Sequence, residues 1–449
     1  MRRWNRLFAE RFRRRKQRDR ESGVALLMCI SMLALLIALT SEFTYGTSIH
    51  SMQAGNARDE VRAHYLARSA VNISRLLIKI QQRFVEPVMK QAQQLLSQAT
   101  GGDMAISLRL TDYAGPIMGF FGGSEAEVQM LGSLVGLDTS QASGLGLDAG
   151  TMDATITTED GKIDINCGSG QTATRARQVT VFTLLSALTF SPRYNDLFSE
   201  QGADGQFVDR GELARAIIDW ADGDYQIFNI EAGSSGGEDY RYDASRDTYE
   251  AHNNSYDTVG EVALVRGMDT RMLEAFAPYL TVYATDERQA CRVNLASVTE
   301  DCTPLLVGLV RAALMRDPTR PPTDPTVLDD NALYPLASIL CERGSAVGFD
   351  SLDTIVSVLS NPQGSIARDD PRYAYMQTLR GITITRGELE QVAYVGDPRV
   401  YRIVATGEVG KVKKTITAIL DTKRALDNPV TQEPESEKAA GVLQYWREE

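Results

Sequence analysis

The stretch "RDRESGVALLMCISMLALLIALTSEF", residues 18–43, decides the fold of this chain. From Ser22 to Ser41 it holds no charged residue. An α-helix needs about 20 mostly apolar residues to cross the roughly 30 Å hydrocarbon core of a bilayer. No other run among the 449 residues meets this requirement, and the chain from Glu42 onward is typical of a water-soluble protein. The sequence therefore predicts a single membrane helix followed by a large soluble part.

The charges on either side of this stretch predict its orientation. Residues 1–23 contain ten Lys or Arg and three Asp or Glu, a net charge of +7. Basic flanks stay in the cytoplasm, so the bulk of the chain is expected outside the cytoplasm. Subtracting +7 from the whole-chain charge of −12 leaves −19 for that part. This argues against nucleic acid as a partner, because phosphate binding needs clustered Lys and Arg.

Three interpretations of the opening stretch differ in where the chain is cut. A secretory signal ends in a small-residue cleavage site after its apolar core, whereas here the core is followed by "ALTSEFTYG". An uncleaved anchor, giving a bitopic membrane protein with a periplasmic binding or hydrolase domain, fits the charge and length but leaves "ESG" unexplained. In the third interpretation, a basic leader (residues 1–23) is removed after Gly23. The apolar helix then begins the mature chain at Val24, as in type IV prepilin-like proteins.

Residues 24–40 are the expected membrane part of a longer helix, and residues 41–100 are its expected soluble part. Apolar side chains recur at three- and four-residue steps from Ala57 to Ile80. This spacing is typical of an amphipathic helix.

The two parts can form one continuous rod. No proline occurs between Gly23 and Pro87, and some 60 helical residues would extend roughly 90 Å. The alternative is two helices joined by a break at Gly46 or Gly55, because glycine weakens a helix interior.

Strand-like alternation follows in residues 101–170, in "DMAISLRLTDY" and "MDATITTEDGKIDIN". Asp160 and Gly161 in the second segment predict a hairpin turn. Between the two segments lies a Gly-rich stretch, residues 115–150, for which we predict a mobile loop with one short helix around residues 125–135.

Residues 171–375 switch to short blocks of helical period, and strand-like alternation returns in residues 376–423 in "GITITRGEL", "RVYRIVATGEV" and "KVKKTITAILDTK". Gly410 predicts a hairpin turn between the last two. The tail, residues 424–449, is charged and contains proline, and we predict that it is disordered, with a short helix or a docking motif as the alternatives for its last few residues.

These elements predict an α+β fold. Short strands cannot close a sheet alone, so the strands at the two ends of the soluble part need one another as partners. The expected architecture is a long N-terminal helix packed on a small antiparallel sheet, with a large, mostly α-helical domain inserted between the strands.

Four of the five cysteines lie outside the membrane run, in a compartment where disulfides form. Four cysteines allow three pairings, and Cys291 with Cys302 closes the shortest loop. We therefore predict that pair, with free buried thiols as the alternative.

An acidic block extends from Asp219 to Asp257, with ten carboxylates and two arginines. The helical segment "ELARAIIDW" ends near Trp220, so Asp219 lies at its C-terminal end, where the helix dipole disfavours a carboxylate unless a cation compensates. Flexible, Gly-rich carboxylate loops suit calcium, which takes six to eight oxygen ligands. The candidate ligands are Asp219, Asp222, Asp224, Glu238 and Asp239. The alternative is a solvated acidic loop, and the spacing is not that of an EF-hand.

The segment "SYDTVGEVALVRGMDTRMLEAFAPYL", residues 255–280, has the outline of a helix-hairpin-helix, the basis of an alternative function in DNA uptake. Its hairpin contains a single glycine and carries Asp269 beside Arg266. In these acidic surroundings a packing role is the better interpretation. No P-loop, nucleophile elbow, CxxC or histidine ligand spacing occurs, so the sequence does not predict an enzyme.

Taken in order, several segments resemble the minor pseudopilin K family of type II protein secretion systems (general secretion pathway protein K). They are the leader ending in Gly23, "VALLMCISMLALLIAL", "AHYLARSAVNISRLL", "EDGKIDIN", "LARAIIDWADGD", "GGEDYRY", "YDTVGEVALVRGM", "FAPYLTVYAT" and "CRVNLASVT". The resemblance implies a pilin-like αβ fold with a calcium-binding α insertion, and cleavage by a prepilin peptidase between Gly23 and Val24.

The resemblance also implies a place at the tip of the pseudopilus. Most pilins have Glu at mature position five, paired with the N-terminal amine of the neighbouring subunit. Counting from Val24, that position is Met28, and a first subunit has no partner amine ahead of it. The implied role is non-enzymatic initiation of assembly in support of protein export. The implied partners are the I, J and H minor pseudopilins, the major pseudopilin and the inner-membrane secretion platform.

Overall fold

The computed structural model describes residues 2–100, 109–122, 150–170, 173–201, 207–230, 236–237, 249–283, 290–298, 301–316, 330–349, 351–364, 368, 372–423 and 441–449. The strand predicted for "DMAISLRLTDY" is wrong in its last four residues, which form a 3-10 turn, η2 (Leu110–Tyr113). The predicted Gly-rich loop begins instead with a helix, α3 (Ala114–Gly122). Residues 103–108 and the helix predicted around residues 125–135 lie outside the described residues. So does the tail between residues 424 and 440.

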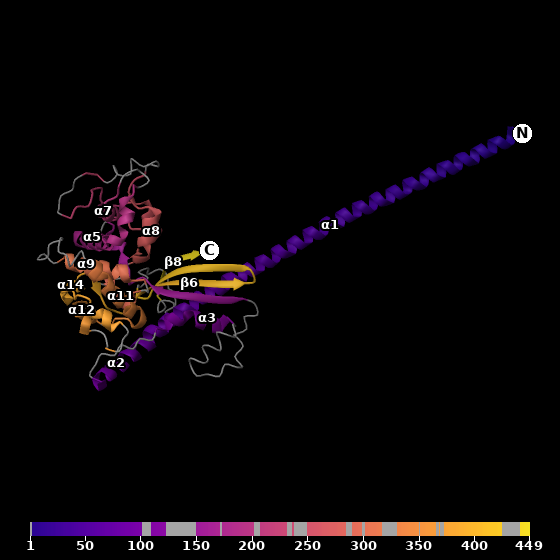
Figure 1. Ribbon diagram of the computed structural model, residues 1–449. Helices are drawn as coiled ribbons and strands as arrows, with labels where there is room; N and C mark the ends of the chain where they lie inside the picture. Colours follow the sequence, from indigo (N-terminus) through magenta and orange to yellow (C-terminus); the bar gives the residue numbers. More distant parts are fainter. Residues whose placement is uncertain are drawn as a thin grey trace, which may run out of the picture.

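A single helix, α1 (Arg2–Ile80), runs through both Gly46 and Gly55, so the predicted continuous rod is confirmed over this range. It passes into a π-helical turn, η1 (Gln81–Val85), and then into α2 (Glu86–Thr100). Pro87 has no N–H to donate to the preceding turn, and the wider turn lies immediately before it. Figure 1 shows the first half of α1 projecting far beyond the rest of the molecule.

The second half of α1 packs on a four-stranded antiparallel sheet of order β1-β6-β7-β8 (Figure 1). The strands are β1 (Thr151–Thr158), β6 (Val400–Val409), β7 (Val412–Asp421) and β8 (Val442–Glu448). Small side chains on α1, Ala63, Ala67 and Ala70, are buried against this sheet. Val409 pairs with Val412 and Gly410 has φ +62°, which confirms the predicted hairpin. We call α1, α2 and this sheet, with η2 (Leu110–Tyr113) and α3 (Ala114–Gly122), the helix–sheet unit.

The chain between β1 and β6 forms a separate, mostly helical body, here called the inserted domain. Its helices are α5 (Arg175–Thr189), α6 (Asn195–Ser199), α7 (Arg210–Asp219), α8 (Thr270–Phe276), α9 (Thr303–Met315), α11 (Asp330–Val347), α12 (Leu352–Ser360), α13 (Tyr373–Met376) and α14 (Arg386–Glu390). Short 3-10 turns are η3 (Ile165–Gly168), η4 (Pro192–Tyr194), η6 (Val259–Leu264), η7 (Ala277–Tyr279), η8 (Leu295–Ser297) and η9 (Pro362–Gly364). Two-residue strands pair in parallel, β2 (Ile163–Asp164) with β3 (Leu280–Thr281) and β4 (Val293–Asn294) with β5 (Ala393–Tyr394).

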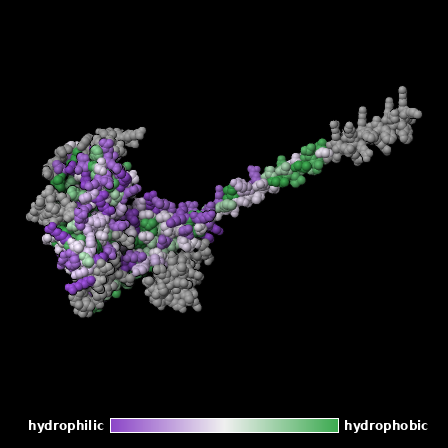
Figure 2. Space-filling model, in the orientation of Figure 1, coloured by the Kyte–Doolittle hydropathy of each residue, from purple (hydrophilic) through white to green (hydrophobic). Residues whose placement is uncertain are grey.

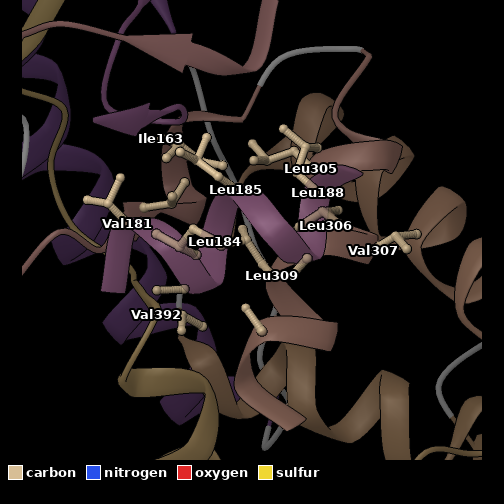
Figure 3. Packing of buried hydrophobic residues seen from close by; sticks show 14 of the residues in the cluster. Ile163, Val181, Leu184, Leu185, Leu188, Leu305, Leu306, Val307, Leu309 and Val392 are labelled. Atoms are coloured by element: carbon tan, nitrogen blue, oxygen red, sulfur yellow. The ribbon is translucent and has the colours of Figure 1, made fainter. Parts of the chain in front are cut away.

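The core of the inserted domain is built where α5 crosses α9 (Figure 3). Leu184 and Leu188 of α5 and Leu306 and Leu309 of α9 are all buried there. This core is separate from the one between α1 and the sheet. The predicted α+β fold, a long helix on a small antiparallel sheet with a helical insertion, is confirmed.

The hairpin predicted at Asp160 and Gly161 is wrong. β1 pairs with β6, more than 200 residues later, and the chain after Gly161 enters the inserted domain. Asp160 is buried, and its carboxylate accepts the backbone N–H groups of Arg399 and Val400. A Cβ on Gly161 would lie 2.4 Å from the Ser297 carbonyl oxygen. Glycine is therefore needed here so that the backbone can approach Ser297 closely, and not to form a hairpin turn.

The strand predicted for "GITITRGEL" is also wrong, because this segment ends in the helix α14. Thr385 caps that helix through its hydroxyl, which accepts the Glu388 N–H, and Glu388 accepts the Thr385 N–H in return. This reciprocal capping box outweighs the alternating pattern of the preceding residues.

The predicted disorder of the tail is wrong for its last nine residues. β8 pairs with β7, with Ala418 opposite Trp446 and Ile416 opposite Glu448. Gln444 also donates to Asp421 at 2.9 Å. The charged composition that predicted disorder fits an edge strand, where many side chains remain in water.

The predicted disulfide between Cys291 and Cys302 is wrong. Cys167 pairs with Cys291, and Cys302 pairs with Cys341, each with 5.5 Å between Cα atoms. β4 and η8 lie between Cys291 and Cys302 in sequence, and Cys302 directly precedes α9. Short sequence separation therefore does not bring these two cysteines together.

We expect reduction of the two disulfides to lower the free energy of unfolding by several kcal/mol. The Cys167–Cys291 bridge spans 124 residues, and in the chain-entropy model a loop of that length is worth about 5 kcal/mol. Peptide mapping without reductant should recover these two pairs, and urea unfolding with and without reductant should show the loss. A peptide linking Cys291 to Cys302 would contradict the structure.

Candidate functional site

The predicted cleavage and membrane residues lie on the projecting part of α1. Val24 and Met28 are 52% and 67% exposed, and nothing lies within 4 Å of a Cβ added at Gly23. Among the described residues, one helix is long and apolar enough to cross a membrane, and it includes the segment from Gly23 onward. Figure 2 shows its apolar stretch outside the folded body, where a bilayer could surround it.

The acidic loop begins at the end of α7. Asp209 caps the start of this helix by accepting two backbone N–H groups. Asp219 is its last residue, and its side chain turns inward: it is 2% exposed and accepts the Phe228 N–H at 2.7 Å. The chain from Trp220 to Phe228 therefore folds back over the end of the helix.

Asp222 is buried on the same loop, with 2% of its surface exposed. One carboxylate oxygen, Oδ2, accepts from the Gln178 amide at 3.0 Å, while Oδ1 is buried with no hydrogen-bond partner. Burial, and next the nearby charges of Asp224 and Asp219, raise the pKa of Asp222 to about 8. A carboxylate in such a place needs either a proton or a cation.

The structure brings together three of the five predicted ligands. Asp224 lies at the exposed end of the loop and accepts the Gln226 N–H at 2.7 Å. Gln226 forms a bridge with Gly237, so the chain leading to Glu238 and Asp239 starts beside the loop. Glu238 and Asp239 themselves lie outside the described residues. Within the part of the chain that the structure describes, no three Asp, Glu, His or Cys side chains form a complete metal site.

The helical hairpin considered for DNA binding is turned toward the protein. Gly267, at its apex, has φ +86° and lies against Val208, whose side chain would be 2.8 Å from an added Cβ. Asp269 caps α8, and Arg271 is paired with Glu200 at 2.7 Å. These contacts favour packing over a role on a phosphate backbone.

Sequence reasoning missed a buried ionic cluster where the inserted domain joins the sheet. Glu159 is fully buried and pairs with Arg402 at 2.6 Å and Lys162 at 3.0 Å. Burial acts to raise the pKa of Glu159, but these two cations hold it below its ordinary value. Arg399 and buried Asp421 form a second pair through two hydrogen bonds. The clue in the sequence was Glu159, an acid next to Asp160, which we had interpreted as a turn residue together with Gly161.

Comparison with known proteins addresses the inserted domain directly. Residues 169–285, which include α5, α7, the acidic loop and α8, match the family model for protein K of the type II secretion system (T2SS). This segment is therefore similar to protein K of that system. The resemblance predicted from the sequence motifs is therefore confirmed, and the candidate metal loop lies within the matched residues.

Two further comparisons complete the picture. The chain matches none of the curated proteins with which it was compared. Among solved structures it is similar to a chain of the GspK–GspI–GspJ complex from the type 2 secretion system of enterotoxigenic Escherichia coli. That match has 16% identity and a TM-score of 0.37, and it covers 69% of this chain and 83% of that chain. The similarity to protein K rests on the family match and not on this superposition.

Proposed function

We propose that this chain is a non-enzymatic minor pseudopilin of a type II protein secretion system. One observation supports this most: a segment similar to protein K lies between two strands of a sheet packed on an uninterrupted membrane-length helix. That arrangement anchors a soluble domain rigidly to the membrane, as a fibre subunit requires.

In this proposal a prepilin peptidase cuts between Gly23 and Val24 and leaves the helix in the inner membrane. The leader, with its net charge of +7, stays in the cytoplasm, and the helix–sheet unit and inserted domain lie in the periplasm. The two disulfides support this location, because such bonds persist in the periplasm and are rare in the cytoplasm.

The proposed position is the tip of the pseudopilus. Met28 is an uncharged residue at mature position five, where a subunit with another ahead of it would carry a carboxylate. The related complex contains GspK with GspI and GspJ, and we propose partners of the I, J and H types here, followed by the major pseudopilin. Together with the inner-membrane platform these subunits would start assembly and support export across the outer membrane.

We also propose that the acidic loop binds calcium. The loop fits a hard cation because Asp222 Oδ1 is a buried carboxylate oxygen with no hydrogen-bond partner, and because Asp219 and Asp224 are close enough to raise its pKa. Asp219, Asp222 and Asp224 would hold the ion together with Glu238 and Asp239. A bound calcium ion would supply positive charge to these carboxylates and stiffen the loop.

Deletion of the gene tests the proposed function. A strain without this chain should fail to export a type II substrate, which would accumulate in the periplasm, and the wild-type chain should restore export. Normal export in the deletion strain, or loss of a hydrolytic activity with export intact, would overturn the proposal. Loss of DNA uptake with normal export would favour the DNA-uptake alternative.

Calcium is expected to raise the melting temperature of the detergent-solubilised chain by about 5 °C or more. A ligand at 100 times its dissociation constant stabilises the native state by about 2.7 kcal/mol, and each kcal/mol shifts the midpoint by a few degrees. Asp222→Asn should abolish the shift. The control is Asp353→Asn. Asp353 is an exposed acid on α12 that pairs with Arg386, and this variant should keep the calcium-dependent shift in melting temperature. Identical melting of the wild-type chain with calcium and with chelator would reject the site.

A further inference from the structure

Asn253 lies against the acidic loop and is held there by its backbone. Its N–H donates to the Trp220 carbonyl oxygen at 2.9 Å. Two residues later, the Ser255 hydroxyl lies 2.7 Å from that of Ser169. Gly170, next along that segment, forms a bridge with Asp222. Asn253 is therefore fixed beside the turn that carries Asp222.

Asn253 has an unusual backbone conformation and a side-chain oxygen without a hydrogen-bond partner. Its φ is +51°, in the left-handed region, which asparagine adopts more readily than most other residues. Its side-chain oxygen, Oδ1, is buried and has no hydrogen-bond partner. The neighbouring side chains are satisfied: His252 pairs with Glu261 at 3.0 Å, and Asn254 accepts the Ser255 N–H at 2.9 Å. The unmet acceptor is thus specific to Asn253.

A buried acceptor without a partner is costly, and a missing water or ion is the usual explanation. Asn253 Oδ1 and Asp222 Oδ1 are both such oxygens, and their segments are joined by the hydrogen bond from the Asn253 N–H to the Trp220 carbonyl oxygen. No Lys or Arg of the described chain pairs with Asp222. A water molecule could donate to both oxygens, but it would leave the charge of Asp222 uncompensated.

We propose that Asn253 Oδ1 is a ligand of the cation bound by the acidic loop. Calcium combines carboxylate oxygens with neutral amide or carbonyl oxygens, and Asn253 supplies one of the latter from outside the loop itself. Through this ligand the ion would join the loop after α7 to the segment that leads into η6. This inference rests on the proposed calcium site and adds a residue to it.

Glycine and aspartate variants of Asn253 separate the amide oxygen from the backbone. Asn253→Gly removes the oxygen but tolerates φ +51°, whereas Asn253→Asp keeps an oxygen at the same place. In calorimetric titration of the full-length chain in detergent with calcium chloride, Asn253→Gly should bind at least about tenfold more weakly than wild type. Asn253→Asp should bind as tightly as wild type or more tightly, and the control Asn254→Ala should be unchanged.

The outcomes distinguish this inference from the calcium proposal. If Asp222→Asn abolishes binding while Asn253→Gly binds like wild type, calcium binds the loop but Asn253 is not a ligand. If the wild-type chain binds no calcium, both proposals fail. Melting in chelator provides the remaining check: Asn253→Gly should melt like wild type there. A large drop without calcium would show that Asn253 only supports the fold.

Discussion

Gly407→Ala is expected to lower the free energy of unfolding of the chain by about 3 kcal/mol. Gly407 on β6 lies directly against the backbone of α1. A Cβ there would lie 2.1 Å from the Ala63 carbonyl oxygen and 2.6 Å from the Ala67 nitrogen. Both are backbone atoms of a regular helix and cannot move aside as a side chain can. The helix must therefore lift from the sheet, and the contacts of Ala63, Ala67 and Ala70 with β6 and β7 weaken together. Urea unfolding in detergent, followed by circular dichroism, measures the loss.

Gly410→Asn is the matched control on the same strand pair. Gly410 has φ +62° and nothing within 4 Å of an added Cβ, and asparagine accepts this conformation. Its effect should stay within about 0.5 kcal/mol. Equal stabilities of the two variants would contradict the close packing of α1 on β6.

Gly23→Ala is expected to block removal of the leader and to reduce export to the level of a strain that lacks the chain. The fold itself makes no demand for glycine here, because nothing lies within 4 Å of an added Cβ. Alanine would even favour the helix by up to about 1 kcal/mol. If export and processing require glycine at position 23, the requirement therefore comes from the proposed prepilin peptidase, which must reach the backbone at this residue. Immunoblotting for the uncut chain and an export assay measure the two effects.

Gly46→Ala and Gly55→Ala make the same chemical change at helix positions that are equally open. Both variants should be processed normally and should support export. Normal processing of Gly23→Ala would remove the basis for cleavage at this site, and failure of all three variants would point to a general effect on the helix.

The sequence was most informative where one local pattern decides the structure. The uncharged run, the absence of proline before Pro87 and the three- and four-residue spacing together predicted α1 as one rod. Gly410 between two alternating segments predicted the β6–β7 hairpin. In both cases the decisive contacts lie within a few residues of one another, so periodicity and turn chemistry suffice.

Elsewhere the decisive contacts join distant segments, and local patterns misled. Asp160 and Gly161 have the composition of a turn, but Asp160 binds the backbone at Arg399 and Val400. Cys291 pairs with Cys167, 124 residues away, and not with the nearer Cys302. β8 gains its order from β7 and not from its own charged sequence. Each of these depends on which surfaces the insertion brings together.

The candidate metal loop was predictable in part. The density of acids located Asp219, Asp222 and Asp224, but it could not show that Asp222 is buried while Asp224 is exposed. Asn253 carries no charge, and nothing in its sequence neighbourhood distinguishes it from Asn254. Only its left-handed backbone and buried oxygen single it out.

The mass of the mature chain tests the central claim most directly. The chain should be purified from cells with an active prepilin peptidase and measured intact, with fragmentation of its N-terminal peptide. A pseudopilin processed as proposed lacks its first 23 residues and begins at Val24. A full-length chain that still begins at Met1 in those cells would contradict the account.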